Sequence, residues 1–189
     1  LDPLDGTWNF ANGLAVFGVI LAVVERGETV WGMLYDPLMD DWIVGRKGGG
    51  AWFARAGEMP VQVSAAETTD PSQAAGYMPV QALPAQRRKA LALASLQVGR
   101  AGQLRCSCHE YRLLAQGRIG FILSAALAPW DHAAGVLIAE EAGGLARVAG
   151  DRRYTPSLTE GHLLVAATPR LHGALTEVFG AALGFESPG

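Results

Sequence analysis

The sequence has little cysteine, no excess of positive charge and no long apolar run, and each shortage excludes a class of protein. Cys106 and Cys108 are the two cysteines among 189 residues, and without a second cluster they do not form a zinc site. We therefore expect free thiols in a reducing cytoplasm. A net charge of −3 leaves no basic stripe, so we expect no nucleic-acid partner. The apolar run at 14–24 is too short to cross a membrane, so no membrane partner is expected either.

The chain does carry enough apolar residues to build one sizeable core. Half of its residues are hydrophobic, and this composition and length suit a single globular domain. The sequence contains neither internal repeats nor low-complexity tracts. A polar stretch at 67–73 separates two halves. We expect an antiparallel-sheet half at 1–66 and an alternating α/β half at 74–189.

Turn signals divide the first half into short strands. Residues 25–28 read as a tight turn, Asp36-Pro37 stops the next apolar run, and residues 46–50 form a glycine-rich loop. Between these turns we expect a β-meander with strands at 15–24, 29–35, 41–45, 51–53 and 61–63.

The second half alternates short apolar runs with helical patterns. We expect strands at 74–78, 103–106, 120–123 and 163–167. We expect helices at 84–96, at 107–116, from Asp131 to Gly143-Gly144, and at 169–179. Residues 109–112 are polar on a helix whose other side is apolar, and we interpret them as a solvated face or a subunit contact.

Residues 2–7 read Asp-Pro-Leu-Asp-Gly-Thr and carry the most specific chemistry in the chain. Pro3 biases Asp2 toward an extended conformation, and Asp5-Gly6 reads as a tight turn. Both carboxylates are therefore expected near one point, where their oxygens suit a hard cation such as Mg²⁺. An ordinary turn explains this segment equally well when it is taken alone.

A second acidic position follows far along the chain. Residues 130–135 read Trp-Asp-His-Ala-Ala-Gly and lead into an apolar run that ends Glu-Ala-Gly-Gly. Taken alone, Asp131 is most simply the N-cap of this helix. His132 beside it is interpreted as a surface or capping histidine.

Together the two segments resemble the motifs of the inositol monophosphatase family. That family's first motif is Asp-Pro-(Leu/Ile)-Asp-Gly-Thr followed by Asn-Phe, and Trp8-Asn9-Phe10 completes it here. Its second motif is Trp-Asp-x-Ala-Ala-Gly followed by an apolar helix ending Glu-Ala-Gly-Gly. The resemblance extends from Leu1 to at least Ala167. It implies an α+β fold with the layered αβαβα architecture of Mg²⁺-dependent, lithium-sensitive phosphomonoesterases.

The resemblance also implies a role for each motif residue. Asp2 bridges two Mg²⁺ ions, the Leu4 carbonyl completes the first ion, and Asp5 and Asp131 ligate the second. The N–H groups of Gly6 and Thr7 hold the phosphate, and Thr7 orients the attacking water. On this interpretation, Asp5 and Thr7 are the catalytic residues.

Two serines are candidates for contact with the rest of the substrate. Ser124 stands where inositol-specific members of the family have a glutamate, which weakens the case for myo-inositol phosphate. Ser107 lies near a substrate-contact position of the family, although a simple N-cap explains it more readily.

The chain departs from the family at its start. Family members carry a further segment before the first motif, including a glutamate that ligates the metals. We therefore expect a phosphatase domain that is incomplete as numbered and inactive by itself.

The function implied is hydrolysis of a small phosphomonoester resembling an inositol phosphate, by a cytoplasmic homodimer. Histidinol phosphate and 3′-phosphoadenosine nucleotides are alternative substrates. A catalytically silent binding or regulatory protein is the alternative from another class. Its mark would be a lost metal carboxylate, whereas Asp2, Asp5 and Asp131 are all present.

Overall fold

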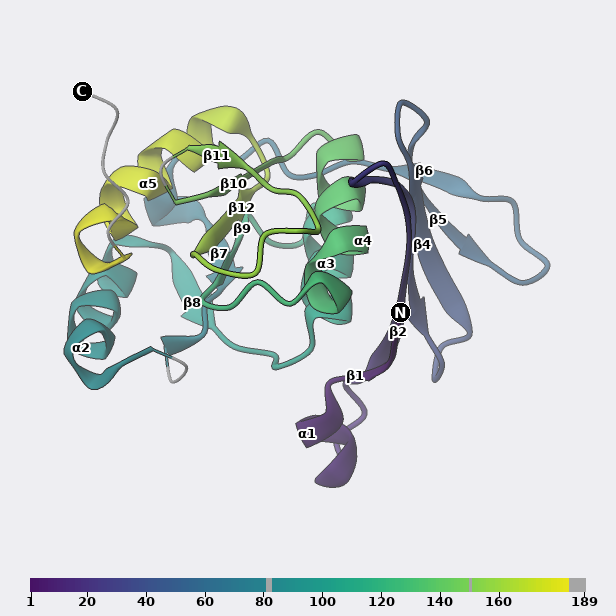
Figure 1. The fold of residues 1–189 in the computed structure, drawn as a ribbon, viewed down its shortest axis with the longest axis horizontal. Helices are drawn as coiled ribbons and strands as arrows, with labels where there is room; N and C mark the ends of the chain where they lie inside the picture. The colour runs from purple at the N-terminus through teal and green to yellow at the C-terminus, as the bar shows by residue number, and fades with distance from the viewer. Residues whose placement is uncertain (81–82, 150, 184–189) are drawn as a thin grey trace.

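The first half of the chain folds into a six-stranded antiparallel sheet, shown in Figure 1. The computed structural model describes residues 1–80, 83–149 and 151–183. Neighbouring strands follow one another in the chain. Arg26 and Gly27, with φ of 52° and 82°, form the two-residue turn of the second hairpin. The strands are β1 (Asp2–Asp5), β2 (Gly18–Glu25), β3 (Glu28–Asp36), β4 (Asp41–Arg46), β5 (Gly50–Arg55) and β6 (Val61–Val63), with helix α1 (Thr7–Ala11) between β1 and β2.

The second half forms a mixed sheet with the order β11-β10-β12-β9-β7-β8. Strand β7 is parallel to β8 and to β9, whereas β12 is antiparallel to both of its neighbours. The strands are β7 (Ala75–Tyr77), β8 (Arg100–Gly102), β9 (Phe121–Ser124), β10 (Leu145–Val148), β11 (Arg152–Arg153) and β12 (Leu163–Ala166), and a 3₁₀ turn, η1 (Pro71–Gln73), precedes β7.

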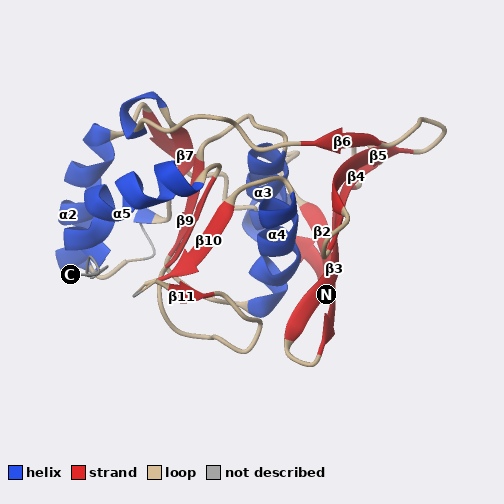
Figure 2. Ribbon diagram, turned by 90° about the horizontal axis from the view of Figure 1, so that it is seen from above, coloured by secondary structure: helices blue, strands red, loops and turns tan. Residues whose placement is uncertain are grey.

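Two pairs of helices complete the layers. Figure 2 shows α3 (Ser107–Ala115) and α4 (Pro129–Glu141) between the sheets, and α2 (Ala85–Ala94) and α5 (Pro169–Leu183) on the far side of the second sheet. A short 3₁₀ turn, η3 (Ser95–Gln97), follows α2. One apolar core lies around α3 and α4, and a second lies between the mixed sheet and α2 and α5. The predicted α+β class, with an antiparallel sheet before a mixed one, is confirmed.

Small residues allow α4 to lie close to its neighbours. A Cβ on Gly32 of β3 would come within 2.9 Å of the Cβ of Ala134, and one on Gly45 of β4 within 2.8 Å of Ile138. On the other side, a Cβ on Gly135 would lie 2.2 Å from the ring of Tyr111 in α3. The helix that carries Asp131 is therefore fixed against the first sheet and against α3.

Several element boundaries differ from those expected. The strand expected at 103–106 is instead β8 at Arg100–Gly102, because the chain then turns through Arg105 with a φ of 58°. The long strand expected from residue 15 begins at Gly18. Strands β10 and β11 were not predicted at all. No helix among the described ranges is long and apolar enough to cross a lipid bilayer.

Candidate active site

The first acidic motif forms a sharp bend at the end of strand β1. The Leu4 N–H donates to the Asp2 Oδ1 at 3.0 Å, and the Thr7 hydroxyl donates to the Leu4 carbonyl at 2.9 Å. Gly6 has a φ of 81°, and a Cβ there would lie 2.8 Å from the Val16 carbonyl. Glycine is therefore required at this point, and the bend directs Asp2 and Asp5 toward one region.

Asp131 reaches the same region from helix α4. Asp2, Asp5 and Asp131 each place one carboxylate oxygen within 4.8 Å of the others. Ligands on opposite sides of a Mg²⁺ ion lie about 4.2 Å apart, since each bond is about 2.1 Å. Oxygens within 4.8 Å of one another are therefore close to the spacing that one ion needs. The three acids therefore converge as the motifs predicted, and their all-oxygen donor set fits a hard divalent cation.

The alternative interpretation of Asp131 as a helix cap is wrong. Helix α4 begins at Pro129, and Ala128 is its N-cap residue. Asp131 lies inside the first turn, because the proline can take the first helical position without losing a hydrogen bond. Its carboxylate is therefore directed to the other acids instead of to the end of its own helix.

Burial and the charges of neighbouring acids make the carboxylates of Asp5 and Asp131 hold protons more strongly than usual. Burial raises the pKa of Asp131 to about 7, helped by the charges of Asp5 and Asp2 and by a hydrogen bond with Asp2. Burial is also the main cause that raises the pKa of Asp5. A bound cation would relieve this repulsion, as expected for a site that gathers like charges.

The start of helix α3 holds Asp5 in place. Asp5 Oδ2 accepts hydrogen bonds from the Cys108 N–H and, at 3.3 Å, from the Cys106 thiol. Both cysteines are free, as predicted, and the structure shows that both are buried. Burial is the main cause that raises the pKa of each thiol. The thiols therefore remain protonated, and Cys106 acts as a donor to Asp5.

A cavity of about 240 Å³ opens beside the acids. Both candidate serines line it, Ser124 from the end of β9 and Ser107 from the first turn of α3. The predicted capping role of Ser107 is wrong, because Cys106 occupies the N-cap position. The other lining residues are Asp5, Met78, Pro79, Gln103, Arg105, Cys106, Glu110, Leu123, Ala125, Ala126, Asp131 and His132.

Tyr111 and Arg112 of α3 were expected on a solvated face or at a subunit contact, but both are buried. Arg112 is buried, donates to the Leu34 carbonyl at 2.9 Å, and pairs with Asp41 of β4. Tyr111 is also fully buried, against α4. The segment at 109–112 is therefore an interior contact between α3 and its neighbours instead of a solvated face. A polar helix face cannot reveal such partners, because Asp41 lies far away in the sequence.

His132 is likewise an interior residue instead of a surface or capping histidine. Its Nδ1 lies 3.1 Å from the Tyr111 hydroxyl, and its Nε2 lies 2.9 Å from the Ala126 carbonyl. Burial lowers its pKa to about 4. A neutral ring that donates from Nε2 and accepts at Nδ1 satisfies both contacts. His132 thereby ties α4 to the segment that follows Ser124.

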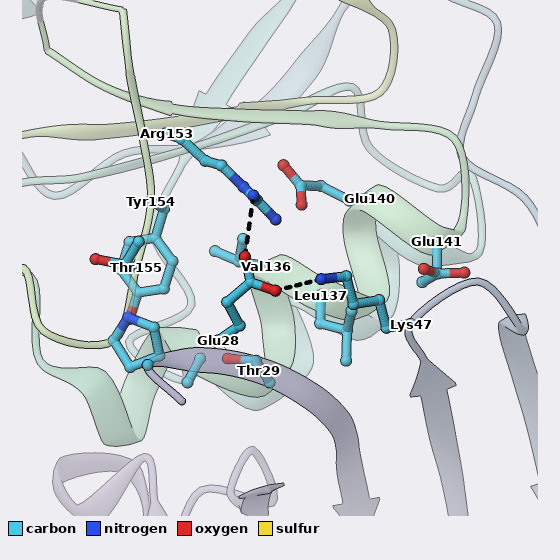
Figure 3. Close-up of a pocket in the computed structure, with 13 residues that line it drawn as sticks. Glu28, Thr29, Lys47, Val136, Leu137, Glu140, Glu141, Arg153, Tyr154 and Thr155 are labelled. Carbon is cyan, nitrogen blue, oxygen red and sulfur yellow. Dashed lines mark hydrogen bonds and ion pairs between the residues drawn. The ribbon is translucent and has the colours of Figure 1, made fainter. Parts of the chain in front are cut away.

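A second cavity, of about 150 Å³, lies between α4, the β2–β3 hairpin and the segment from Arg153 to Pro156 (Figure 3). Glu28 at its mouth pairs with Lys47 and, at 3.3 Å, with Arg153. Glu141 accepts hydrogen bonds from the N–H groups of Gly48 and Gly50. Because Glu28, Lys47, Arg153 and Glu141 already have partners in this second cavity, it offers less to an ionic ligand than the cavity beside Asp131.

The fold and the site together define a layered α+β protein with an acidic cluster suited to a divalent cation. The sequence model described as "Inositol monophosphatase family" matches residues 1–183, and the chain belongs to this family. It is a family of Mg²⁺-dependent phosphomonoesterases.

Curated relatives match over most of this chain but less of their own. Nus factor SuhB of Pasteurella multocida is 32% identical over 182 residues, which cover 90% of this chain and 62% of that protein. Inositol-1-monophosphatase of Bacillus subtilis is 27% identical over 182 residues, covering 95% and 66%. The chain thus spans slightly less than two thirds of each relative's length.

Solved structures confirm the fold. An inositol monophosphatase from Zymomonas mobilis superposes with a TM-score of 0.83 at 26% identity, covering 94% of this chain and 68% of that one. An IMPase from Thermotoga maritima gives a TM-score of 0.82 at 24% identity, covering 97% and 68%.

Proposed function

We propose that this protein hydrolyses a small phosphomonoester with the help of Mg²⁺. The observation that carries the proposal is the convergence of Asp2, Asp5 and Asp131 beside a cavity that could admit a small molecule. A phosphomonoester is a dianion, so a metal site beside a cavity suits its hydrolysis. Both acidic motifs of the sequence contribute carboxylates to that one point.

Each residue of the bend has a separate task in this proposal. Asp2 would be shared by two cations, Asp5 and Asp131 would help to hold one of them, and the Leu4 carbonyl would help to hold the other. When bound, Mg²⁺ supplies positive charge against the phosphate and lowers the pKa of water. The Thr7 hydroxyl, which already donates to the Leu4 carbonyl, orients the attacking water. The N–H groups of Gly6 and Thr7 face the phosphate.

The alcohol part of the substrate would occupy the cavity between Ser107 and Ser124. Ser124 cannot supply the charge or reach of a glutamate, so we expect no strong preference for myo-inositol 1-phosphate. Histidinol phosphate and 3′-phosphoadenosine nucleotides remain alternatives. A more than hundredfold preference for inositol 1-phosphate over other small phosphomonoesters, roughly 2.7 kcal/mol of differential transition-state binding, would refute this expectation.

A phosphate-release assay on the full gene product tests the proposal. It uses a panel of small phosphomonoesters with and without Mg²⁺. We expect Mg²⁺-dependent turnover that falls by about 10²-fold or more in Asp5→Asn, since that residue holds the cation. Asp151→Asn is the matched control, because Asp151 is exposed and lies outside the cavity. Its turnover should match that of the unmodified protein.

The competing function is binding or regulation without catalysis. Several relatives carry the name Nus factor SuhB, including the one from Pasteurella multocida. Absence of Mg²⁺-dependent turnover on the whole panel, in a folded protein, would favour this alternative. Retention of all three carboxylates is what favours the hydrolase.

A further inference from the structure

Among the described residues that line the cavity beside the acids, Arg105 is the one Lys or Arg. The other titratable residues that line it are the acids Asp5, Glu110 and Asp131, the cysteine Cys106, and His132, whose ring nitrogens both have partners in the Tyr111 hydroxyl and the Ala126 carbonyl. Arg105 forms no ion pair with any described residue. An exposed, unpaired guanidinium at the wall of a cavity is available to an anion.

The guanidinium of Arg105 makes one cation–π contact, which orients it. Its Cζ lies 4.1 Å from the ring centroid of Trp8. Trp8 directly follows Thr7, so this contact ties Arg105 to the segment that carries the acidic motif. Stacking uses the face of the guanidinium and leaves its N–H edge free to bind a carboxylate or phosphate with two parallel hydrogen bonds.

The backbone of Arg105 is also held in an unusual conformation. Its φ is 58°, a region that favours glycine. The preceding residue, Leu104, is held by two hydrogen bonds. Nδ2 of the buried Asn9 donates to its carbonyl at 2.8 Å, and its N–H donates to the Glu110 carboxylate at 3.1 Å. Such strain persists where the surroundings enforce it, and it concentrates at functional sites.

Arg105 lies on a different segment from the three carboxylates. It directly precedes Cys106, the N-cap of α3, whereas Asp2 and Asp5 belong to β1 and Asp131 lies in the first turn of α4. In the proposed function the carboxylate group serves the phosphate, so an anion bound by Arg105 is a further group of the substrate.

We propose that Arg105 recognises a second anionic group on the substrate, and this inference rests on the proposed phosphatase function. The substrate class is then a phosphomonoester that also carries a carboxylate or a second phosphate. Arg105 is a specificity-determining residue in this account. Trp8, Asn9 and Glu110 are positioning residues that fix its side chain and its backbone.

A matched pair of substrates tests the proposal. Glycerol 2-phosphate and 2-phosphoglycerate carry the same secondary phosphate, and they differ in that one hydroxymethyl group is replaced by a carboxylate. We expect the unmodified full gene product to have a kcat/KM about 10–100-fold higher for 2-phosphoglycerate, the size typical of a charge-assisted hydrogen bond. Arg105→Gln should abolish that preference, mainly through KM. Arg105→Lys should retain only part of the preference for 2-phosphoglycerate, because an ammonium group neither stacks on a ring nor forms two parallel hydrogen bonds.

Two controls separate specificity from folding. Arg100→Gln removes an exposed arginine of β8 that does not line this cavity, and it should leave the preference intact. Arg105→Gly removes the guanidinium and relieves the backbone strain, so it should lose the preference even if Arg105→Gln folds poorly. Equal losses on both substrates in the Arg105 variants, or no loss on either, would overturn the proposal.

Failure of the phosphatase function would look different from failure of this inference. Absence of Mg²⁺-dependent turnover on the whole phosphomonoester panel, these two compounds included, would contradict the proposed function alone. Calorimetric binding of 2-phosphoglycerate and glycerol 2-phosphate in the presence of Mg²⁺ then decides the role of Arg105. Tighter binding of the carboxylated compound that is lost in Arg105→Gln supports it, and equal binding of both compounds contradicts it.

Discussion

At the residue scale, the acids around the candidate site divide into three that could share a cation and one that supports the backbone. Asp131 shares its surroundings with Asp2 and Asp5, so a metal ion can neutralise all three. Glu110 is different, because its carboxylate accepts from the Leu104 N–H beside Arg105. Burial, the largest cause, raises the pKa of Glu110 to about 7. Glu110 therefore supports the cavity wall at a cost in stability at neutral pH.

The variant Glu110→Gln should change how stability depends on pH. The folded pKa of about 7 exceeds the ordinary value of 4.5, so the stabilisation from protonated Glu110 is complete below pH 4.5 and is lost as the pH rises through 7. Glutamine keeps an acceptor for the Leu104 N–H and has no charge to bury. Urea unfolding without Mg²⁺ at pH 5 and pH 8 should therefore show about 2–3 kcal/mol less pH dependence in the variant.

The exposed Glu160 provides the control for this comparison. Glu160→Gln should retain the pH dependence of the unmodified protein. An identical pH dependence in Glu110→Gln would contradict the assignment of a buried, easily protonated Glu110.

The acidic cluster could be predicted from sequence, whereas its supporting residues could not. Asp2 and Asp5 lie in one short motif whose turn residues fix the local bend, and a second motif marks Asp131. No local motif marks Glu110 or Arg112. Glu110 accepts a hydrogen bond from the Leu104 N–H, and Arg112 pairs with Asp41 of β4, so the surroundings of both depend on the folded chain. Their environment is a product of tertiary packing instead of local pattern.

At the scale of elements, close approach of α3 and α4 decides where the site residues lie. Asp5 contacts the start of α3, and Asp131 lies in the first turn of α4. Gly135 permits the two helices to meet, since Tyr111 fills the space where its Cβ would be. The helix spacing is thus part of the geometry of the acidic cluster.

Two glycine-to-alanine variants should have opposite effects on stability. Gly135→Ala should destabilise the protein by about 1–3 kcal/mol, because the new methyl group overlaps the fully buried Tyr111 ring. Gly173→Ala in α5 should stabilise it by up to about 1 kcal/mol, because nothing lies within 4 Å of its Cβ and alanine favours the helix. Chemical denaturation of both variants measures the difference. Stabilisation by Gly135→Ala would contradict the packing described for α3 and α4.

Strands bounded by turn residues were better predicted than strands without such signals. The hairpins of the first sheet carry tight-turn residues, and the turn at Arg26-Gly27 occurs where the sequence placed it. Strands β8, β10 and β11 are four residues or shorter. They are fixed by pairing with distant strands, such as Leu145 opposite Ala166, and their own residues show no comparable signal.

At the scale of the whole molecule, the first sheet has two unequal faces. Ile20, Leu34 and Ile43 lie opposite one another and are buried toward α3 and α4. The adjacent row on the other face is also apolar and consists of Leu21, Met33, Val44 and Trp52. No helix of residues 1–80, 83–149 or 151–183 covers that outer row (Figure 2). The described layers are therefore sheet, helices, sheet and helices.

An uncovered apolar face should make residues 1–189 self-associate when they are produced alone. We expect the apparent mass in sedimentation to rise with concentration in the micromolar range. Trp52→Lys should reduce this association, because it places a charge within the outer row. Leu96→Lys is the control, since Leu96 is 80% exposed but lies outside the sheet. A chain that stays monomeric throughout, or equal effects of the two variants, would contradict the expectation.

Metal binding by the carboxylate cluster can be seen directly in a crystal structure of the full gene product grown with Mn²⁺, with its anomalous scattering recorded. Mn²⁺ accepts the same oxygen ligands as Mg²⁺. The account predicts an anomalous peak within bonding distance of the carboxylates of Asp2, Asp5 and Asp131, absent from Asp5→Asn crystals grown at the same Mn²⁺ concentration. A peak elsewhere, or none among these three carboxylates at millimolar Mn²⁺, would contradict the assignment of this cluster as a metal centre.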